Sequence, residues 1–289
     1  MTRLFGFIQF DFAGSLAVAD GRYLIRDGKR EQVLVVETLG ASPPARRRRK
    51  RPKNAEVGEP PPELPVGRAT VVLAFNEFES EQAAETWLSQ TTASEEAIDQ
   101  LVEQGIDELN QALHTQSVAS GDPYPQTVTP ARAVVIRIGV GGGEALADGA
   151  FTSAHRVDPG LGPLSRRRQR DEELRPQQRL AAVLGDREQL DACETLLLRT
   201  RADLDAGRNR EAALQLRVGL EALLVELKGA LSDPGHEEDM ATLSASRREV
   251  GELANVALSA DLDSDQVESL GELLATAERV LRRRRVLGG

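Results

Sequence analysis

The sequence predicts an α+β protein, in which an N-terminal domain with an antiparallel sheet and two helices precedes an all-α four-helix bundle. Two observations predict this arrangement. All ten aromatic residues of the 289-residue chain lie at or before Phe151, and the hydrophobic pattern becomes helical throughout from Leu180 onward. Because two halves of such different composition are best explained by separate cores, we expect an α+β domain at 1–157, a linker at 158–180 and a helical domain at 181–289.

The β signals of the N-terminal domain come in short runs separated by turns. Phenylalanines alternate for the most part along residues 5–12, and further apolar runs occupy 22–25 and 33–36. The Asp-Gly steps at 20–21 and 27–28 favour a meander of hairpins. Further strands are expected at 70–75 and 133–138, with a hairpin partner for the second of these within 146–157.

Two helices are expected between these later strands. Ser80 is a typical N-cap, and the acidic Glu81 that follows suits the positive end of a helix over 80–90. The second helix shows apolar residues at helical spacing along one side. They are Ile98, Leu101, Val102, Gly105, Ile106, Leu109 and Leu113.

Two segments have the composition of loops. Residues 41–67 combine prolines with a basic run at 46–51, and proline together with concentrated like charge opposes packing. We therefore expect a disordered loop inserted between strands. The expected linker at 158–180 is rich in proline, glycine and arginine and carries a second basic run at 166–170.

The C-terminal domain shows four helical stripes. The first runs from Leu190 to Leu204, and the second from Ala213 to Leu231, with Asp233-Pro234-Gly235 expected to end it. A third helix is expected over 243–258. The fourth opens with a capping-box pattern, Asp263-x-x-Gln266. Four helices with short connections predict a small bundle.

Two stretches resemble known families. The stretch VVLAFNEFESEQAAETWLSQ resembles the strand-to-helix step of ferredoxin-like dimeric α/β barrels, which implies ferredoxin-like strand pairing. The hairpin DLDAGRNREAALQLRVGLEALL, within residues 190–231, resembles both a tetratricopeptide-repeat hairpin and the first hairpin of HEPN-type four-helix domains. The sequence holds no second copy at the repeat spacing and lacks the Arg–His motif of HEPN nucleases. The resemblance therefore implies a helical interaction or dimerisation module.

The residues that usually carry catalysis or metal binding do not form a recognised motif. The glycine run at 139–143 lacks the Lys-Ser or Lys-Thr of a phosphate loop and is interpreted as a hairpin turn. His114, His155 and His236 share no metal-ligand spacing and are expected at the surface or in loops. Cys193 lies on an apolar stripe, where it would act as a small hydrophobe. We expect solvated charge in the acidic runs (77–81, 171–173 and 237–239), and we predict no catalytic residue, metal or cofactor.

Three arginine runs, at 46–51, 166–170 and 282–285, suit sequence-independent contact with phosphates. Solubility and genome composition are the alternative explanation of such runs, and the last run also complements a helix dipole. The candidate phosphate or nucleic-acid contacts are Arg46, Arg47, Arg48, Arg49, Lys50, Arg51, Arg166, Arg167 and Arg168.

These observations favour a non-enzymatic interaction, scaffold or assembly protein that binds itself or a protein partner. The candidate interaction surface is the leucine stripe Leu216, Leu220, Leu223 and Leu227. Association with nucleic acid through the arginine runs is the alternative. A third hypothesis places an enzyme or ligand site in a groove against Trp87 or near Arg137. The formal net charge of −10, the absence of a signal peptide and the lack of a long apolar stretch predict a cytoplasmic protein that does not bind membranes.

Overall fold

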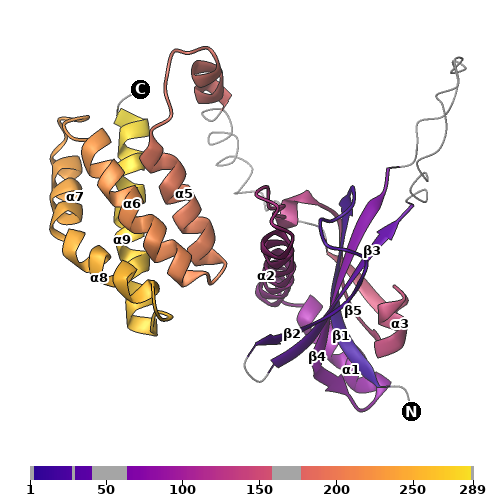
Figure 1. Ribbon diagram of the computed structural model, residues 1–289. Helices are drawn as coiled ribbons and strands as arrows, with labels where there is room; N and C mark the ends of the chain where they lie inside the picture. The colour runs from indigo at the N-terminus through magenta and orange to yellow at the C-terminus, as the bar shows by residue number, and fades with distance from the viewer. Residues whose placement is uncertain (1–2, 28–29, 41–63, 158–176, 288–289) are drawn as a thin grey trace, which may run out of the picture. The chain divides into compact units, whose positions relative to one another are not determined.

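The computed structural model describes residues 3–27, 30–40, 64–157 and 177–287 (Figure 1). The chain divides into two compact units, Met1–Gly162 and Pro163–Gly289, which are called here the sheet unit and the helical unit. The sheet unit is α+β and the helical unit is built from helices, so the predicted fold class is confirmed. Among the described residues, no helix is long and apolar enough to span a membrane.

The sheet unit is organised around one antiparallel sheet of six strands in the order β2-β3-β4-β1-β5-β6. Neighbouring strands pair throughout in antiparallel register, and β1 lies between β4 and β5. The strands are β1 (Leu4–Ala13), β2 (Gly21–Asp27), β3 (Arg30–Leu39), β4 (Val66–Phe78), β5 (Ala133–Gly142) and β6 (Ser153–Val157).

Two helices, α1 (Glu81–Thr92) and α2 (Glu95–Ser120), cover one face of this sheet. The side chains of Ser80 and Ser94 accept hydrogen bonds from backbone N–H groups in the first turn of each helix, which confirms the predicted cap at Ser80. A short 3-10 helix, Pro130–Arg132, leads into β5. The main core lies between the helices and the sheet.

A glycine on α2 brings this helix close to the sheet. A Cβ atom added at Gly105 would lie 2.8 Å from atoms of both Ile8 and Phe10. Phe10 is fully buried, and Leu109 and Leu113 of the same helix are also inside this core. Apolar residues recur at every second position of β1 and at about every 3.6 positions of α2. The two apolar faces therefore pack against each other in one layer.

The topology corrects two expectations for this unit. A ferredoxin-like fold has the order βαββαβ, whereas this chain forms four strands before its first helix, so the predicted ferredoxin-like pairing is wrong. The glycine run at 139–143 is not a hairpin turn. Its first four residues belong to β5, and Gly143 begins the short helix α3 (Gly143–Ala147) before β6. The reason is close packing, because a Cβ at Gly139 would meet the ring of Phe7 at 2.7 Å.

The helical unit contains a helical segment at 177–184 and five further helices among the described residues. Four were expected. The expected third helix, 243–258, covers α8 but only the last residues of α7, which begins at Pro234 and meets α8 at Ser246. The segment at 177–184 begins within the expected linker. Asp233 does not end the preceding helix but caps α7, accepting a hydrogen bond from the backbone N–H of His236 at 2.8 Å. The five are α5 (Ala192–Asp205), α6 (Asn209–Glu226), α7 (Pro234–Ala245), α8 (Arg247–Ala257) and α9 (Ser264–Leu287).

The core of the helical unit consists mainly of leucine and alanine. The predicted capping box is present: Gln266 N–H donates to Asp263 Oδ1 and Asp263 N–H donates to Gln266 Oε1. The leucine stripe that we proposed as an interaction surface is inside this core, with exposed fractions of 2% or less, because its side of α6 packs against the other helices of the same unit. This placement excludes Leu216, Leu220, Leu223 and Leu227 from a solvent-facing surface.

Candidate binding face of the sheet

The face of the sheet opposite to α1 and α2 carries the candidate site. We call it the strap face, because α3 and residues 148–152, together called the strap, lie across part of it. Strand registers place side chains on this face in rows, one from each strand. The apolar row runs from β2 to β6 through Leu24, Val33, Val72, Phe7, Gly139 and Ala154.

The next two rows toward the end of β1 are polar. Polar and charged side chains here share a sheet face with the apolar row, which is uncommon for buried positions and requires hydrogen-bond partners. The first row is Arg22, Val35, Thr70, Gln9, Arg137 and Arg156, from β2 to β6. The second is Glu37, Arg68, Asp11 and Val135, from β3 to β5.

Asp11 is the centre of a hydrogen-bonded network on this face. Arg68 Nε and Nη2 donate to its two carboxylate oxygens at 2.7 and 3.1 Å, and Arg137 Nη1 donates to Oδ2 at 2.9 Å. Burial alone would raise the pKa of Asp11. The hydrogen bonds and positive charges of Arg68 and Arg137 outweigh burial and hold the pKa below its usual 3.8. Asp11 is therefore ionised at neutral pH.

Gln9 orients Arg137 from the same row. Arg137 Nη1 donates to Gln9 Oε1 at 2.9 Å, and Gln9 Nε2 donates to Thr70 Oγ1 at 2.9 Å. Gln9 and Thr70 are each only 1% exposed. This buried chain of bonds fixes the amide orientation of Gln9 and, through it, the position of the Arg137 guanidinium.

The strap closes part of the face. Leu146 packs on Phe7 and Val72, while Asp148 forms an ion pair of 3.2 Å with Arg22 on β2. Gly149 has a φ of +72° and lies over Arg68 and Glu37, both of whose side chains would be 3.3 Å from an added Cβ. A side chain at this position would thus combine backbone strain with contact on the charged row.

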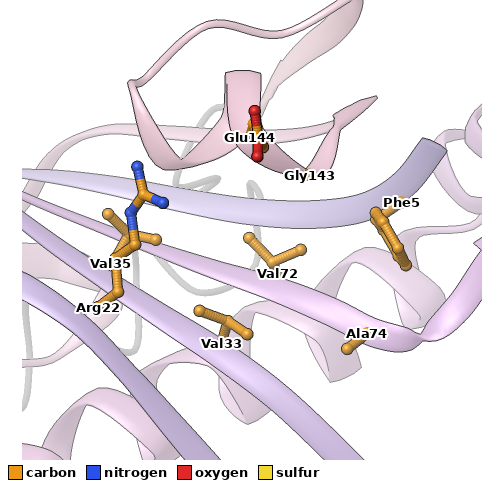
Figure 2. A pocket seen from close by; sticks show the side chains of 8 residues that line it. All are labelled: Phe5, Arg22, Val33, Val35, Val72, Ala74, Gly143 and Glu144. Atoms are coloured by element: carbon orange, nitrogen blue, oxygen red, sulfur yellow. The ribbon is translucent and has the colours of Figure 1, made fainter. Parts of the chain in front are cut away.

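Beside the strap lies an open pocket with a volume of about 330 Å³ (Figure 2). Strands β3 and β4 provide an apolar floor, Phe5 closes one end, and the charged side chains of Arg22 and Glu144 stand at the rim. This volume is at the lower end of the range for small-molecule sites. The lining residues are Phe5, Arg22, Val33, Val35, Val72, Ala74, Gly143 and Glu144.

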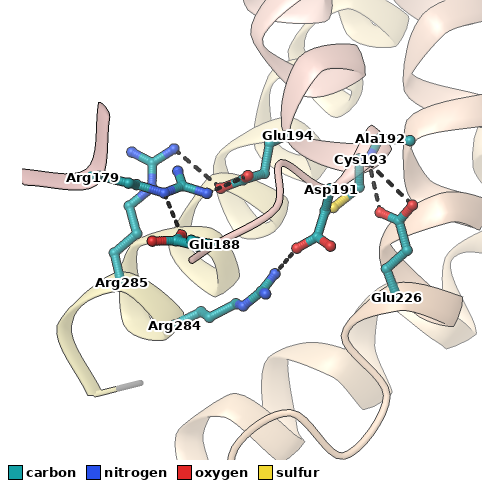
Figure 3. A network of polar contacts seen from close by, with 9 residues as sticks. All are labelled: Arg179, Glu188, Asp191, Ala192, Cys193, Glu194, Glu226, Arg284 and Arg285. Carbon is teal, nitrogen blue, oxygen red and sulfur yellow. Dashed lines mark hydrogen bonds and ion pairs between the residues drawn. The ribbon is translucent and has the colours of Figure 1, made fainter. Parts of the chain in front are cut away.

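In the helical unit, charged side chains form ion pairs that connect one helical segment to another. Arg284 pairs with Asp191, and Arg179 pairs with Glu188 at 2.7 Å and with Glu194 at 2.6 Å (Figure 3). Arg285 approaches Glu194 at 3.6 Å. Burial would raise the pKa of Glu194, but the hydrogen bond and charge of Arg179, with the charge of Arg285, lower it. These pairs connect α9 and the segment 177–184 to the start of α5.

The start of α5 is also capped by Glu226, at the end of α6. Its carboxylate accepts hydrogen bonds from Ala192 N–H at 3.2 Å and Cys193 N–H at 2.9 Å (Figure 3). Cys193 is fully buried, as predicted for a small hydrophobe. Burial, followed by the hydrogen bond and charge of Glu226, raises the pKa of its thiol to about 12, so the thiol stays neutral at physiological pH.

The structure describes some of the predicted site residues and not others. Residues 46–51 and 166–170, which include every candidate phosphate contact, lie outside the described residues. In the run at 282–285, Arg283, Arg284 and Arg285 form ion pairs within the helical unit, so this run mainly connects helices. The groove suggested against Trp87 is filled, because the indole packs on Phe78 at 5.5 Å between ring centroids and against Gly6.

Two side chains of α7 that were expected in loops or in solvent are buried. His236 is not in a loop but in the first turn of α7, where its side chain is buried. Asp239, expected to be solvated, is also buried on α7 and accepts hydrogen bonds from Arg279 and Arg283 of α9 at 2.9 Å each. Both errors follow from placing the start of α7 about nine residues too late.

Arg137 was among the predicted site positions, whereas its partners Gln9, Asp11 and Arg68 were not predicted. A signal was present in β1, where two polar residues alternate with phenylalanines in the stretch FIQFDF. Polar residues at alternate positions of an otherwise buried strand indicate a face that binds other polar groups.

Comparison with known proteins adds no relative. No protein-family model, curated protein or solved structure matches the chain.

Proposed function

We propose that the protein is a non-enzymatic interaction and assembly protein that associates with a second copy of itself through the strap face. The observation that carries the proposal is that this face has both a pocket and an exposed apolar side chain beside it. Leu24 is 53% exposed and is paired in register with Val33, which lines the pocket. An interface with two-fold symmetry needs both halves of such a contact on one surface.

The two features are complementary in chemistry. The floor of the pocket is made of valine and alanine side chains, of which Val33 and Ala74 are only partly buried. Inserting Leu24 of a second copy would remove apolar surface of both partners from water, and central aliphatic anchors of this kind carry much of the binding energy in protein interfaces. Charged groups at the rim, Arg22 and Glu144, suit the polar border of such an interface.

Sedimentation velocity of the full-length chain over a range of concentrations measures its oligomeric state and so tests this proposal. We expect a dimer that Leu24→Glu and Ala74→Glu each weaken by about tenfold or more, because each places a charge in the apolar contact. Val134→Glu is the matched control, since Val134 is a 59% exposed valine of the same sheet that does not line the pocket.

Mixing the two variants sharpens the test. A mixed dimer of Leu24→Glu and Ala74→Glu chains retains one intact anchor and one intact pocket that face each other, so mixing should restore part of the association. A wild-type chain that remains monomeric at its highest concentration would refute the proposal. Equal loss in the Val134→Glu control would also refute it, because the effect would then not be specific to the pocket.

Association with nucleic acid is the second candidate function, and one observation favours it. Both segments that carry the candidate contacts leave the sheet at the same end, where β1 finishes. The first departs after β3 and returns at β4, where Leu39 pairs with Val66, and the second follows Val157 at the end of β6. Two basic segments that begin at one end of a sheet can act on the same polyanion.

A mixed-sequence oligonucleotide titrated into the full-length protein at low and high salt tests this second function. Replacing Arg46, Arg47, Arg48 and Arg49 by Gln should weaken binding equally for unrelated sequences and flatten its salt dependence. Arg248→Gln is the control, as a single exposed arginine of the helical unit outside the three arginine runs. Binding that is absent at low salt, or that the fourfold variant retains unchanged, would exclude this function.

A further inference from the structure

Two arginines occupy an unusual position at the edge of the strap face. Arg137 of β5 and Arg156 of β6 are direct register partners in the antiparallel ladder, so their side chains project from the same face of the sheet. Like charges placed directly opposite each other destabilise a strand pair. An anion held between them would remove this cost.

Arg137 is held in place for such a contact. Its Nη1 atom donates to both Gln9 and Asp11, which are buried, and its side chain remains 25% exposed. Among the described residues, the hydrogen-bond partners of this guanidinium are bound through Nη1. The N–H groups of Nε and Nη2 can therefore donate to another partner. The group is thus oriented by the protein without using its whole set of donors.

The charges nearby leave an excess of one positive charge. Asp11 is shared by Arg68 and Arg137, and Glu37 acts electrostatically on Arg68. Arg156 is exposed, and within the described parts of the chain it has no carboxylate at ion-pair distance. Three arginines against two carboxylates therefore leave a net charge of +1 in this part of the face.

We propose that Arg137 and Arg156 form a binding site for a phosphate group, either free inorganic phosphate or the phosphate monoester of a larger molecule. A tetrahedral phosphate offers several oxygens and can accept hydrogen bonds from two guanidinium groups at once, each in bidentate geometry. Gln9 and Asp11 are positioning residues, since they hold Arg137. The site is independent of the pocket and of the proposed self-association.

Titration of the full-length protein with inorganic phosphate by isothermal calorimetry tests the site, with sodium chloride at matched ionic strength as the reference. Arg156→Gln is the principal variant because Arg156 is exposed, and it should weaken phosphate binding by about tenfold or more. Arg26→Gln is the matched control. Arg26 is an exposed arginine of the opposite edge strand β2 that does not line the pocket, and its replacement should leave phosphate binding unchanged.

A second titration distinguishes the sources of the phosphate group. A short oligonucleotide with a 5′-terminal phosphate, compared with the same oligonucleotide lacking it, shows whether the site takes a phosphate at the end of a nucleic acid; tighter binding of the first that Arg156→Gln removes would assign that source. A response to inorganic phosphate alone assigns a small ligand. Failure of both probes to bind above the chloride reference, or equal binding by wild type and Arg156→Gln, overturns the proposal. Loss of dimerisation in the Leu24→Glu variant would leave these outcomes unchanged.

Discussion

The two units use the same pair of charged groups, arginine and carboxylate, for different purposes. In the helical unit the pairs connect one helix to another: Asp239 of α7 binds Arg279 and Arg283 of α9, and Arg201 of α5 binds Glu278 of α9 through two hydrogen bonds. In the sheet unit the most buried pairs gather on one sheet face around Asp11.

This difference has a consequence for function. Arginines that fix a helix interface have their donors directed at the protein itself. The network around Asp11 instead fixes Arg137 while leaving it partly exposed, opposite a second arginine in the strand register and on the sheet face that also holds the pocket. Preorganised polar groups on a rigid sheet suit recognition of a ligand or partner, so the sheet unit is the better place to look for binding.

The largest effects expected on stability come from the two cores. Phe10→Ala in the sheet unit should lower the free energy of unfolding by about 3–5 kcal/mol, and Leu220→Ala in the helical unit by about 2–5 kcal/mol, because each leaves a cavity in a fully packed region. Fluorescence of Trp87, the single tryptophan of the chain, reports unfolding of the sheet unit. Far-UV circular dichroism follows the helices.

The control for these core variants is Val225→Ala, because Val225 is 73% exposed on α6. Its free energy of unfolding should stay within about 0.5 kcal/mol of wild type. A Phe10→Ala variant whose Trp87 transition is unchanged would contradict the assignment of Phe10 to the core around α2.

A smaller but more specific effect is expected from Asp11→Asn. The change leaves Arg68 and Arg137 partly buried without their shared carboxylate and should cost about 3 kcal/mol. Glu31→Gln is the control, since it breaks an exposed ion pair with Arg26 and should cost less than about 1 kcal/mol. Denaturant unfolding followed by Trp87 fluorescence measures both.

The pH dependence of Asp11→Asn gives a second readout of the same network. The folded-state pKa of Asp11 lies below the value of 3.8 expected for the unfolded chain, so its contribution is fully present above that value and is lost as the pH falls through the lower, folded pKa. The difference in unfolding free energy between wild type and Asp11→Asn should therefore shrink as the pH falls from 5 toward 2. A difference that is constant over this range would show that the carboxylate charge is not what stabilises the network.

How far the fold could be predicted depended on whether the signal was local. Some helix starts were accessible because a cap is defined by residues a few positions apart, as at Ser80 and at Asp263 with Gln266. The cap at Asp233 was missed, because Asp-Pro-Gly is also typical of a turn that ends a helix. Strand order was not accessible, because the pairing of β1 with both β4 and β5 joins residues more than fifty positions apart. A resemblance of twenty residues at one strand-to-helix step could not establish that order.

The candidate site shows the same limit. The leucines of α6 form a stripe that fits equally well a buried core or a docking surface, and only the packing of the neighbouring helices places them inside. Arg137 was predicted only as a position near a groove, and its neighbours Gln9 and Arg156 come from strands on either side. The row across the sheet exists only after the registers are known.

The smallest effect follows from the cap that joins α5 to α6. Glu226→Gln removes the charge that accepts two hydrogen bonds from the N-terminus of α5 and should lower the stability of the helical unit by about 1 kcal/mol. Glu268→Gln, an exposed glutamate of α9, is the control and should change stability by less than about 0.5 kcal/mol. Urea unfolding followed by circular dichroism measures the two. Because the cap is an interaction within the helical unit, Glu226→Gln should leave the phosphate titration of the sheet unit unchanged, and a change there would contradict the division of roles between the units.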